Sequence, residues 1–199
     1  MKKSLSPRSI SKAFALVLFS GAITAQAAET VYTLDPTHTQ VDFHWNHLGL
    51  SEPGASFDEV RGTLRVDDAD PTRSSVEVVM PLSGVRTRVP GFDDDFRSPK
   101  FFDAAKYPNV TFKSTKVERA GIGNRYTVTG DLTAHGITKP AVLDVVLNGQ
   151  GIHPMTKAPV LGFNATTVVK RSDYGLTIAL PMVSDEIQVR ITTEAHASK

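Results

Sequence analysis

The chain has 199 residues, with 22 basic and 21 acidic side chains and no cysteine. A balance so close to neutral, without a basic cluster, gives no electrostatic reason for nucleic-acid binding. The lack of cysteine excludes disulfides, thiol catalysis and cysteine-ligated metals in this chain.

Residues 1–27 have the pattern of a secretory signal peptide. Four basic side chains lie between Lys2 and Lys12, an apolar run follows over residues 13–19, and Ala25-Gln-Ala27 is a small-x-small cleavage pattern. The run is shorter than the roughly 20 residues that a membrane-spanning helix needs. We expect cleavage after Ala27, release into the periplasm and a single mature domain over residues 28–199, which retains 18 basic and 21 acidic side chains.

Alternation of apolar and polar residues at period two predicts β-strands with one buried face. Seven such segments occur, at residues 40–45, 60–66, 76–80, 110–118, 126–133, 161–169 and 186–192. An eighth strand is expected at residues 141–147, which are apolar at nearly every position, so that both faces of this strand would be covered. Short turns between several of them predict neighbouring antiparallel strands in up-and-down order. Eight strands of this kind can close into a barrel that holds one small ligand or is filled by its own side chains. The alternation leaves a two-sheet sandwich open as the other architecture.

The connection between the third and fourth strands, residues 83–108, is far longer than a hairpin needs. Long loops inside compact domains are usually functional. Ser98-Pro99 predicts the start of a helix, and Phe92 and Phe96 would share one face of a helical turn. We interpret the segment as a short helical lid over one barrel mouth. A second long connection, residues 172–185, is expected to form part of the same apolar rim or an extra hairpin through Leu176, Ile178, Leu180 and Met182.

Five motifs follow one another along the chain: Tyr32-Thr-Leu-Asp-Pro-Thr-His38, His47-Leu-Gly49, the lid motif 97–108, the hairpin motif 130–140 and Arg171-Ser-Asp-Tyr-Gly-Leu176. In this order they resemble the YceI-like family of periplasmic lipid-binding proteins. The resemblance implies a lipocalin-like eight-stranded antiparallel barrel with an internal channel for a polyisoprenoid chain. It does not fix the ligand of this member. Phe96, where the family commonly has Leu, and the three acids 93–95 depart from its pattern.

No arrangement of catalytic residues stands out. His44 and His47, with His38 and Asp42 nearby, offer ligands that suit zinc or copper. Residues three apart on a strand point to opposite faces, however, so we predict structural roles for His38 and His47 and no metal site. The sequence has no Gly-x-Ser-x-Gly elbow, phosphate loop or dinucleotide fingerprint. His135, in a turn beside Gly136, is also expected to be structural.

The residues that we expect to contact a ligand are apolar wall and lid residues, with polar groups at the mouth. The apolar set is Phe43, Trp45, Leu64, Phe92, Phe96, Phe101, Phe102, Phe112, Val128, Leu132 and Phe163. The polar set is Arg97, Arg171 and Asp173, together with Asp94. The polar side chains would hold a ligand head group or, on the alternative interpretation, pin the lid and the following loop. The rings would line an open channel or fill a dry barrel, and the cavity volume decides between these.

The sequence therefore predicts a non-catalytic periplasmic carrier that sequesters an isoprenoid lipid or quinone and needs no other cofactor. Transient membrane contact for lipid exchange and a homodimer are the accompanying expectations for partners. Two alternatives stay open: a stress-response or partner-binding barrel with a filled core, and an enzyme that acts on a small apolar or amide substrate at the barrel mouth.

Overall fold

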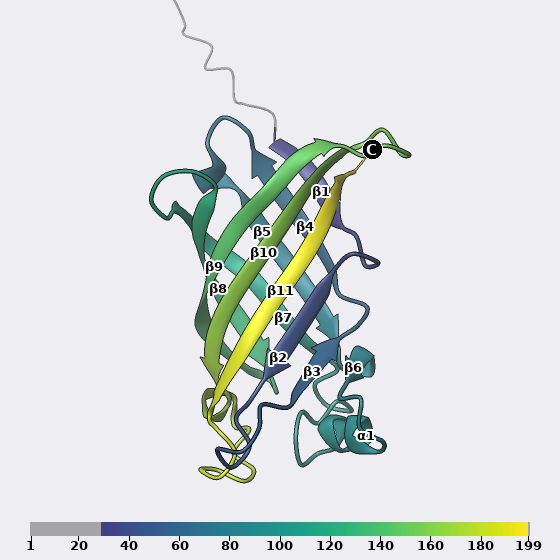
Figure 1. The fold of residues 1–199 in the computed structure, drawn as a ribbon, viewed down its shortest axis with the longest axis vertical. Coiled ribbons are helices and arrows are strands. Elements are labelled where there is room, and N and C mark those ends of the chain that lie inside the picture. The colour runs from purple at the N-terminus through teal and green to yellow at the C-terminus, as the bar shows by residue number, and fades with distance from the viewer. Residues whose placement is uncertain (1–28, 199) are drawn as a thin grey trace, which may run out of the picture.

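The computed structural model describes residues 29–198, and the expected signal peptide, residues 1–27, lies outside the described residues. Among residues 29–198, no helix is long and apolar enough to cross a membrane. The described chain is almost entirely β-structure wound into one tall barrel (Figure 1).

The described residues form eleven strands, one short α-helix and three 3₁₀ turns. The strands are β1 (Glu29–Leu34), β2 (Gln40–His44), β3 (Gly54–Phe57), β4 (Arg61–Asp67), β5 (Ser75–Pro81), β6 (Val85–Arg86), β7 (Asn109–Arg119), β8 (Arg125–Ala134), β9 (Ile137–Ile152), β10 (Pro159–Lys170) and β11 (Glu186–Ala197). The helix is α1 (Phe92–Arg97), and the 3₁₀ turns are η1 (Pro71–Arg73), η2 (Leu82–Gly84) and η3 (Arg171–Tyr174).

Eight strands close into a ring. The order is β1-β4-β5-β7-β8-β9-β10-β11, every pairing is antiparallel, and β11 pairs back onto β1. This confirms the up-and-down barrel and excludes the sandwich. Closure removes the unpaired strand edges that an open sheet would expose.

Three of the eight strands are interrupted. β11 pairs with β1 through residues 195–197 and with β2 through residues 188–192, so β2 continues β1 along the same edge. In the same way, β3 precedes β4 and pairs with β2, so β3 and β4 form one interrupted strand. β6 follows β5 and pairs with β3, so β5 and β6 form another. The interruptions fall at residues 35–39, 58–60 and 82–84.

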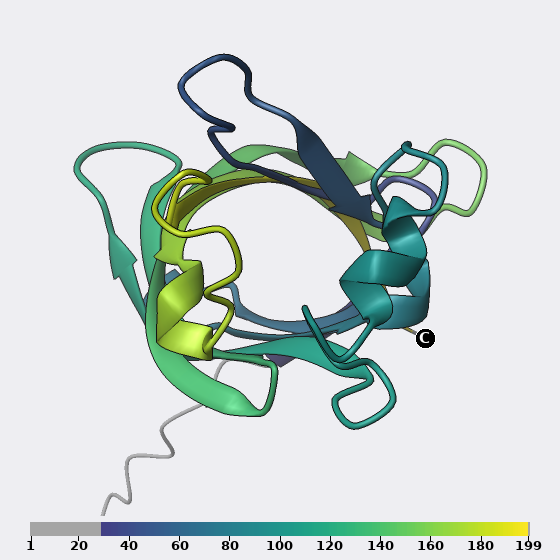
Figure 2. The ribbon, with the colours of Figure 1, turned by 90° about the horizontal axis from the view of Figure 1, so that it is seen from below.

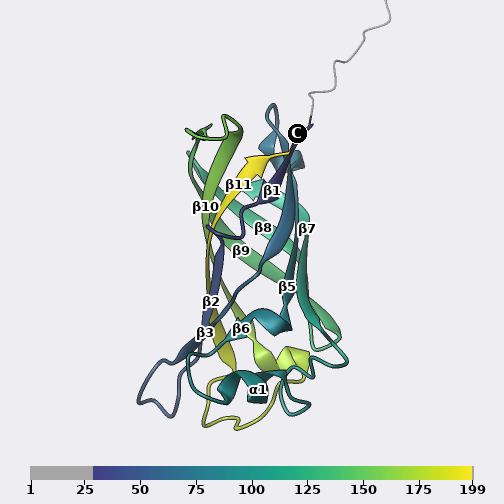
Figure 3. The same cartoon turned by 90° about the vertical axis from the view of Figure 1, so that its right-hand side faces the viewer.

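We call the end of the barrel that carries α1 and residues 172–185 the lid end, and the end with the turns at residues 68–74, 120–124 and 153–158 the turn end (Figure 3). Viewed along the barrel, α1 and η3 lie on opposite sides of the mouth at the lid end (Figure 2). The predicted lid therefore covers part of one mouth, and the 172–185 connection contributes the other side.

The helix in the lid begins earlier than the sequence predicts. It runs from Phe92 to Arg97, and Ser98 ends it by donating its backbone N–H to the Asp95 carbonyl oxygen at 3.0 Å, so the predicted start at Ser98-Pro99 is wrong. Three acids in the first turn complement the positive end of the helix dipole, and Pro99 disfavours helical backbone in the residue before it. The shared face of Phe92 and Phe96 is confirmed by a ring separation of 5.6 Å.

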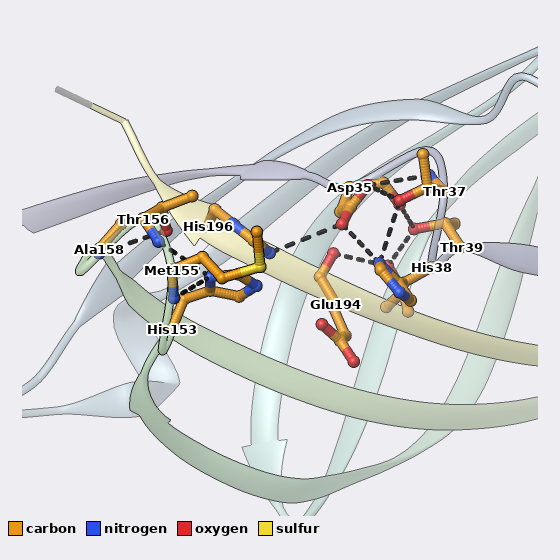
Figure 4. Close-up of polar contacts among 11 residues, drawn as sticks. Asp35, Thr37, His38, Thr39, His153, Met155, Thr156, Ala158, Glu194 and His196 are labelled. Atoms are coloured by element: carbon orange, nitrogen blue, oxygen red, sulfur yellow. Dashed lines mark hydrogen bonds and ion pairs between the residues drawn. The ribbon is translucent and has the colours of Figure 1, made fainter.

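Asp35 holds the interruption between β1 and β2 (Figure 4). Its Oδ1 accepts hydrogen bonds from the backbone N–H of Thr37 at 2.8 Å and the Thr37 hydroxyl at 2.7 Å, while its Oδ2 lies 2.7 Å from Nδ1 of His38. Burial raises the pKa of Asp35, but the hydrogen bonds from His38 and Thr37 outweigh burial and lower it to about 2. The same hydrogen bond raises the pKa of His38. His38 thus has a structural partner, as the sequence analysis expects.

Candidate binding channel

The barrel is hollow. Its interior holds a cavity of about 780 Å³ toward the turn end and another of about 430 Å³ toward the lid end. Well-packed protein interiors leave few voids larger than a water molecule, whereas ligand sites typically span roughly 300–1,000 Å³. The cavity volumes therefore contradict the filled-core interpretation.

The two cavities meet at a waist near the middle of the barrel. Five side chains line both of them: Val41, Met80, Phe112, Leu143 and Ile191. All five are apolar, so only apolar side chains separate the two cavities, and we call the pair the channel.

Most of the turn-end cavity is aliphatic and aromatic, and its mouth is polar. Leu64, Phe112, Val128 and Phe163 line it, four of the residues named from the sequence. Its lining also includes polar side chains that the sequence did not predict as ligand contacts, among them Asp68, Ser74, Ser75, Tyr126 and Gln150. Asp68 and Ser74 belong to the connection between β4 and β5, and Ser75 is the first residue of β5, so no local sequence pattern connects them with the channel.

The lid-end cavity is lined by rings. Phe43, Trp45, Phe92, Phe96, Phe101, Phe102, Phe112 and Leu132 line it, which brings together eight of the residues predicted from the sequence. Phe96 is buried at the centre of this group. Its ring stacks on Phe101 at 5.0 Å and lies within 5.6–6.3 Å of the rings of Phe43, Trp45, Phe92 and Phe102. A ring at position 96 therefore joins the lid to the wall of β2.

Arg171 holds the 172–185 loop in place by donating hydrogen bonds to three of its backbone carbonyl groups. Its Nε donates to the Ser184 carbonyl oxygen at 2.8 Å, Nη1 to Leu176 at 2.8 Å, and Nη2 to Val183 at 3.0 Å. Burial lowers the pKa of its guanidinium, with the charge of Asp185 acting against this. Asp185 in turn accepts hydrogen bonds from the backbone and hydroxyl of Ser172 at 2.8 and 2.7 Å. Of the two roles left open for Arg171, the geometry favours the structural one.

Arg97 and Asp173 lie away from the channel. Neither lines the two cavities. Arg97 donates to Asp94 at 3.0 Å and to the Ser83 carbonyl oxygen at 3.4 Å, which favours the role of pinning the lid, and Asp173 is exposed. Arg171 and Tyr174, which lie on η3 with Asp173, line the lid-end cavity. Asp173 itself faces solvent. A head-group role for Arg97 or Asp173 would need the lid or loop to move.

The histidines near the lid end have structural partners. His135 donates its Nδ1–H to the Tyr174 carbonyl oxygen at 3.0 Å, and its ring meets the Tyr107 ring edge-on at 5.1 Å. His47 lines the lid-end cavity and bridges to Val183. These contacts tie the β8–β9 turn and the 46–51 turn to the 172–185 loop.

The ligand atoms of Asp35, His38 and Glu194 lie within 4.8 Å of one another, on the outer surface of the barrel. Asp35 and His38 are already bonded to each other and to Thr37. Nε2 of His196 is buried without a hydrogen bond and lies 3.6 Å from Oδ2 of Asp35. The hydrogen bonds within the turn account for Asp35 and His38 without a cation.

Comparison with known proteins agrees with the residue motifs. The family model described as "YceI-like domain" matches residues 32–195. Protein YceI of Escherichia coli O157:H7 is 34% identical over 199 residues, covering 100% of both chains. A crystal structure of the Campylobacter jejuni YCEI protein is 28% identical, with a TM-score of 0.67 over 77% of this chain and 90% of that one.

Two further solved structures share the fold. Burkholderia cenocepacia BcnA aligns with a TM-score of 0.72 and 22% identity, covering 81% of this chain and 98% of that one. A polyisoprenoid-binding domain from Saccharophagus degradans aligns with a TM-score of 0.57 and 18% identity, covering 85% and 99%. On the family match over residues 32–195 and the identity over the whole length, this chain belongs to the YceI-like family.

Proposed function

We propose that this protein holds one long apolar lipid of the polyisoprenoid class in its barrel and carries it through the periplasm without changing it chemically. The observation that carries the proposal is the apolar channel, with about 780 and 430 Å³ on either side of its waist. The name of the Saccharophagus degradans neighbour, a polyisoprenoid-binding domain, supports the same class of ligand. An isoprenoid quinone has the same kind of tail and belongs to the same proposal.

The physical basis is burial of hydrocarbon. Each CH₂-sized group removed from water contributes about 0.8 kcal/mol, so one five-carbon isoprene unit contributes about 4 kcal/mol. The channel walls supply this burial without charged groups. The polar side chains of the turn-end mouth, among them Ser74, Ser75 and Gln150, are suited to hydrogen-bond a head group there.

The amino-terminal pattern supports a periplasmic location, because residues 1–27 combine a basic start, an apolar run and a small-x-small cleavage pattern. A free isoprenoid is too apolar to cross an aqueous compartment unaided. A carrier in the periplasm would meet that need, and loading or release would require transient contact with a membrane.

The decisive experiment is mass spectrometry of an organic extract of the protein purified from the periplasm. Leu143→Trp supplies the blocked variant, because Leu143 lines both cavities at the waist. Val142→Trp is the matched control, since Val142 is the next residue on β9 and is 51% exposed. We expect about one isoprenoid per chain in the unmodified protein and in Val142→Trp, and at least a tenfold lower content in Leu143→Trp.

Two outcomes would overturn the proposal. One is a folded protein that yields no lipid and takes up neither added ubiquinone nor a prenyl alcohol. The other is equal lipid content in Leu143→Trp and Val142→Trp, which would place the lipid outside the channel.

A further inference from the structure

Two loops at the lid end expose large apolar side chains to solvent. They are residues 45–53 and 172–185, which extend beyond the barrel at the bottom of Figure 1. Leu50 is 83% exposed, Met182 62%, Leu48 50% and Ile178 40%. We call these four side chains the apolar tip. Clustered exposed apolar groups usually mark an interaction site.

The two loops form a single surface. The Leu48 N–H donates to the Met182 carbonyl oxygen at 3.0 Å. Asn46 and Ser184 exchange two hydrogen bonds, from the Asn46 N–H to the Ser184 hydroxyl and from the Ser184 N–H to the Asn46 carbonyl oxygen, each 2.9 Å. Ile178 itself lines the lid-end cavity. The apolar tip is therefore continuous with one mouth of the channel.

In the first loop, residues 45–53, many backbone N–H groups donate hydrogen bonds to acceptors within the protein. Five consecutive N–H groups have acceptors within the protein: Asn46 to Ser184 Oγ, His47 to the Ser51 carbonyl, Leu48 to the Met182 carbonyl, Gly49 to Asn46 Oδ1 and Leu50 to the His47 carbonyl, at 2.7–3.0 Å. Entry into hydrocarbon requires that backbone groups be satisfied internally. The five N–H groups of residues 46–50 meet that requirement within the protein.

Leu48 has a backbone conformation that a leucine side chain disfavours. Leu48 has φ 59° and Gly49 has φ 71°, the left-handed pair of a type I′ turn. Such turns prefer Asn or Asp followed by Gly. A leucine in this position costs backbone strain and gains nothing from the turn, so its value lies in the apolar surface that it presents.

The charge of the two loops indicates the chemistry of the partner. Residues 46–53 and 172–185 contain no lysine or arginine and three acids, Glu52, Asp173 and Asp185. An anionic surface would not attract them. Exposed aliphatic side chains without cations, on a loop in which five consecutive N–H groups already have acceptors, fit the apolar boundary of a lipid bilayer.

We propose that the apolar tip inserts into the interface of a phospholipid bilayer and docks the lid end there, so that lipid passes between channel and membrane without crossing water. The inference rests on the proposed carrier function and names the surface through which it acts. Insertion is driven by burial of Leu48, Leu50, Ile178 and Met182 and not by attraction to lipid charge.

Flotation of the full chain with phosphatidylcholine vesicles tests the proposal. The test variant is Leu50→Gln with Met182→Gln, which removes the apolar groups at nearly constant size. The matched control is Ile122→Gln with Met155→Gln, because Ile122 is 102% and Met155 is 85% exposed on turns at the opposite end. We expect the test variant to bind vesicles at least tenfold more weakly than the unmodified protein and the control to bind as the unmodified protein does.

Replacing a quarter of the phosphatidylcholine with phosphatidylglycerol should give no increase in binding, and neither should lower salt. Equal loss in both double variants, or binding that appears only with phosphatidylglycerol, would overturn the proposal. So would sedimentation showing that the tip forms a dimer between two copies while no vesicle binding occurs. Lipid content measured on the same samples separates the docking proposal from the carrier proposal. A protein that contains lipid but does not bind vesicles would refute docking and leave the carrier proposal unaffected.

Discussion

Replacing Arg171 by lysine should destabilise the protein although the charge is kept. The three guanidinium nitrogens of Arg171 donate to three different carbonyl oxygens, those of Ser184, Leu176 and Val183. A lysine ammonium is a single point on a flexible stem and cannot match this fork. At least two of the three carbonyl groups would lose their donor.

The size of the effect follows from these contacts. A hydrogen bond to a charged group contributes about 1.5–3 kcal/mol, and Arg171 is partly exposed, which lowers the figure. We expect Arg171→Lys to lose about 2–4 kcal/mol of unfolding free energy. For a domain of this size, each kcal/mol corresponds to roughly 2–4 °C in Tm, so Tm should fall by about 5–15 °C.

Thermal unfolding followed by circular dichroism, together with amide hydrogen exchange at Val183 and Ser184, measures the effect. Arg190→Lys is the matched control, because Arg190 is exposed on β11. It should change the unfolding free energy by less than about 0.5 kcal/mol. If the two variants show the same Tm and the same exchange rates, Arg171 does not hold the 172–185 loop and the structural assignment is wrong.

Two further predictions concern the lid and the interruption of the first strand. Phe101→Ala should speed the release of bound lipid at least tenfold while costing about 1–2 kcal/mol of stability, because Phe101 is half-buried and lines the lid-end cavity; equal fractional losses, read from lipid content over time and from thermal unfolding, would argue against a lid role. Asp35→Asn should flatten the acid-unfolding curve, since a carboxyl group whose folded pKa of about 2 lies below its ordinary 3.8 stabilises the fold above pH 3.8, and that stability is lost as pH falls through about 2. The contribution is at most about 2 kcal/mol, and Asp131→Asn, at an exposed residue of β8, is the control that should keep the acid slope.

The strands were predictable because the barrel wall obeys one local rule. One face of each strand meets the channel and the other meets solvent, so alternation at period two appears wherever a strand lies. β9 follows the same rule, because Val142 is 51% exposed on the outer face and Leu143 lines the channel. The expectation that both faces of residues 141–147 are covered is therefore wrong. The same rule could not place β1, because Glu29–Leu34 offers only two inward residues, Tyr32 and Leu34, before the chain breaks at Asp35.

The apolar part of the candidate site was also predictable, while its polar part was not. An apolar side chain on the buried face of a barrel strand must face the interior, and six of the predicted residues line the channel from strands. The other five, Trp45 and the four phenylalanines of the lid segment, line it from connections. A polar side chain in a loop has no such constraint. Arg171 and Arg97 look alike in sequence, yet Arg171 turns inward to three carbonyl oxygens and Arg97 turns outward to Asp94. Only the path of the loop decides between these outcomes.

The interrupted strands favour the lid end as the place where the proposed lipid exchange occurs. Within residues 29–198, β6 pairs with β3 alone, and β7 pairs with β5 and β8, so the ladder between β6 and β7 is missing there. The lid segment between these two strands contacts the wall through side chains, such as the ring of Phe96 against those of Phe43 and Trp45. Regions held by few backbone hydrogen bonds open at a lower free energy than the ladders around them. We therefore expect the lid end to open at a lower free energy than the closed eight-stranded ring.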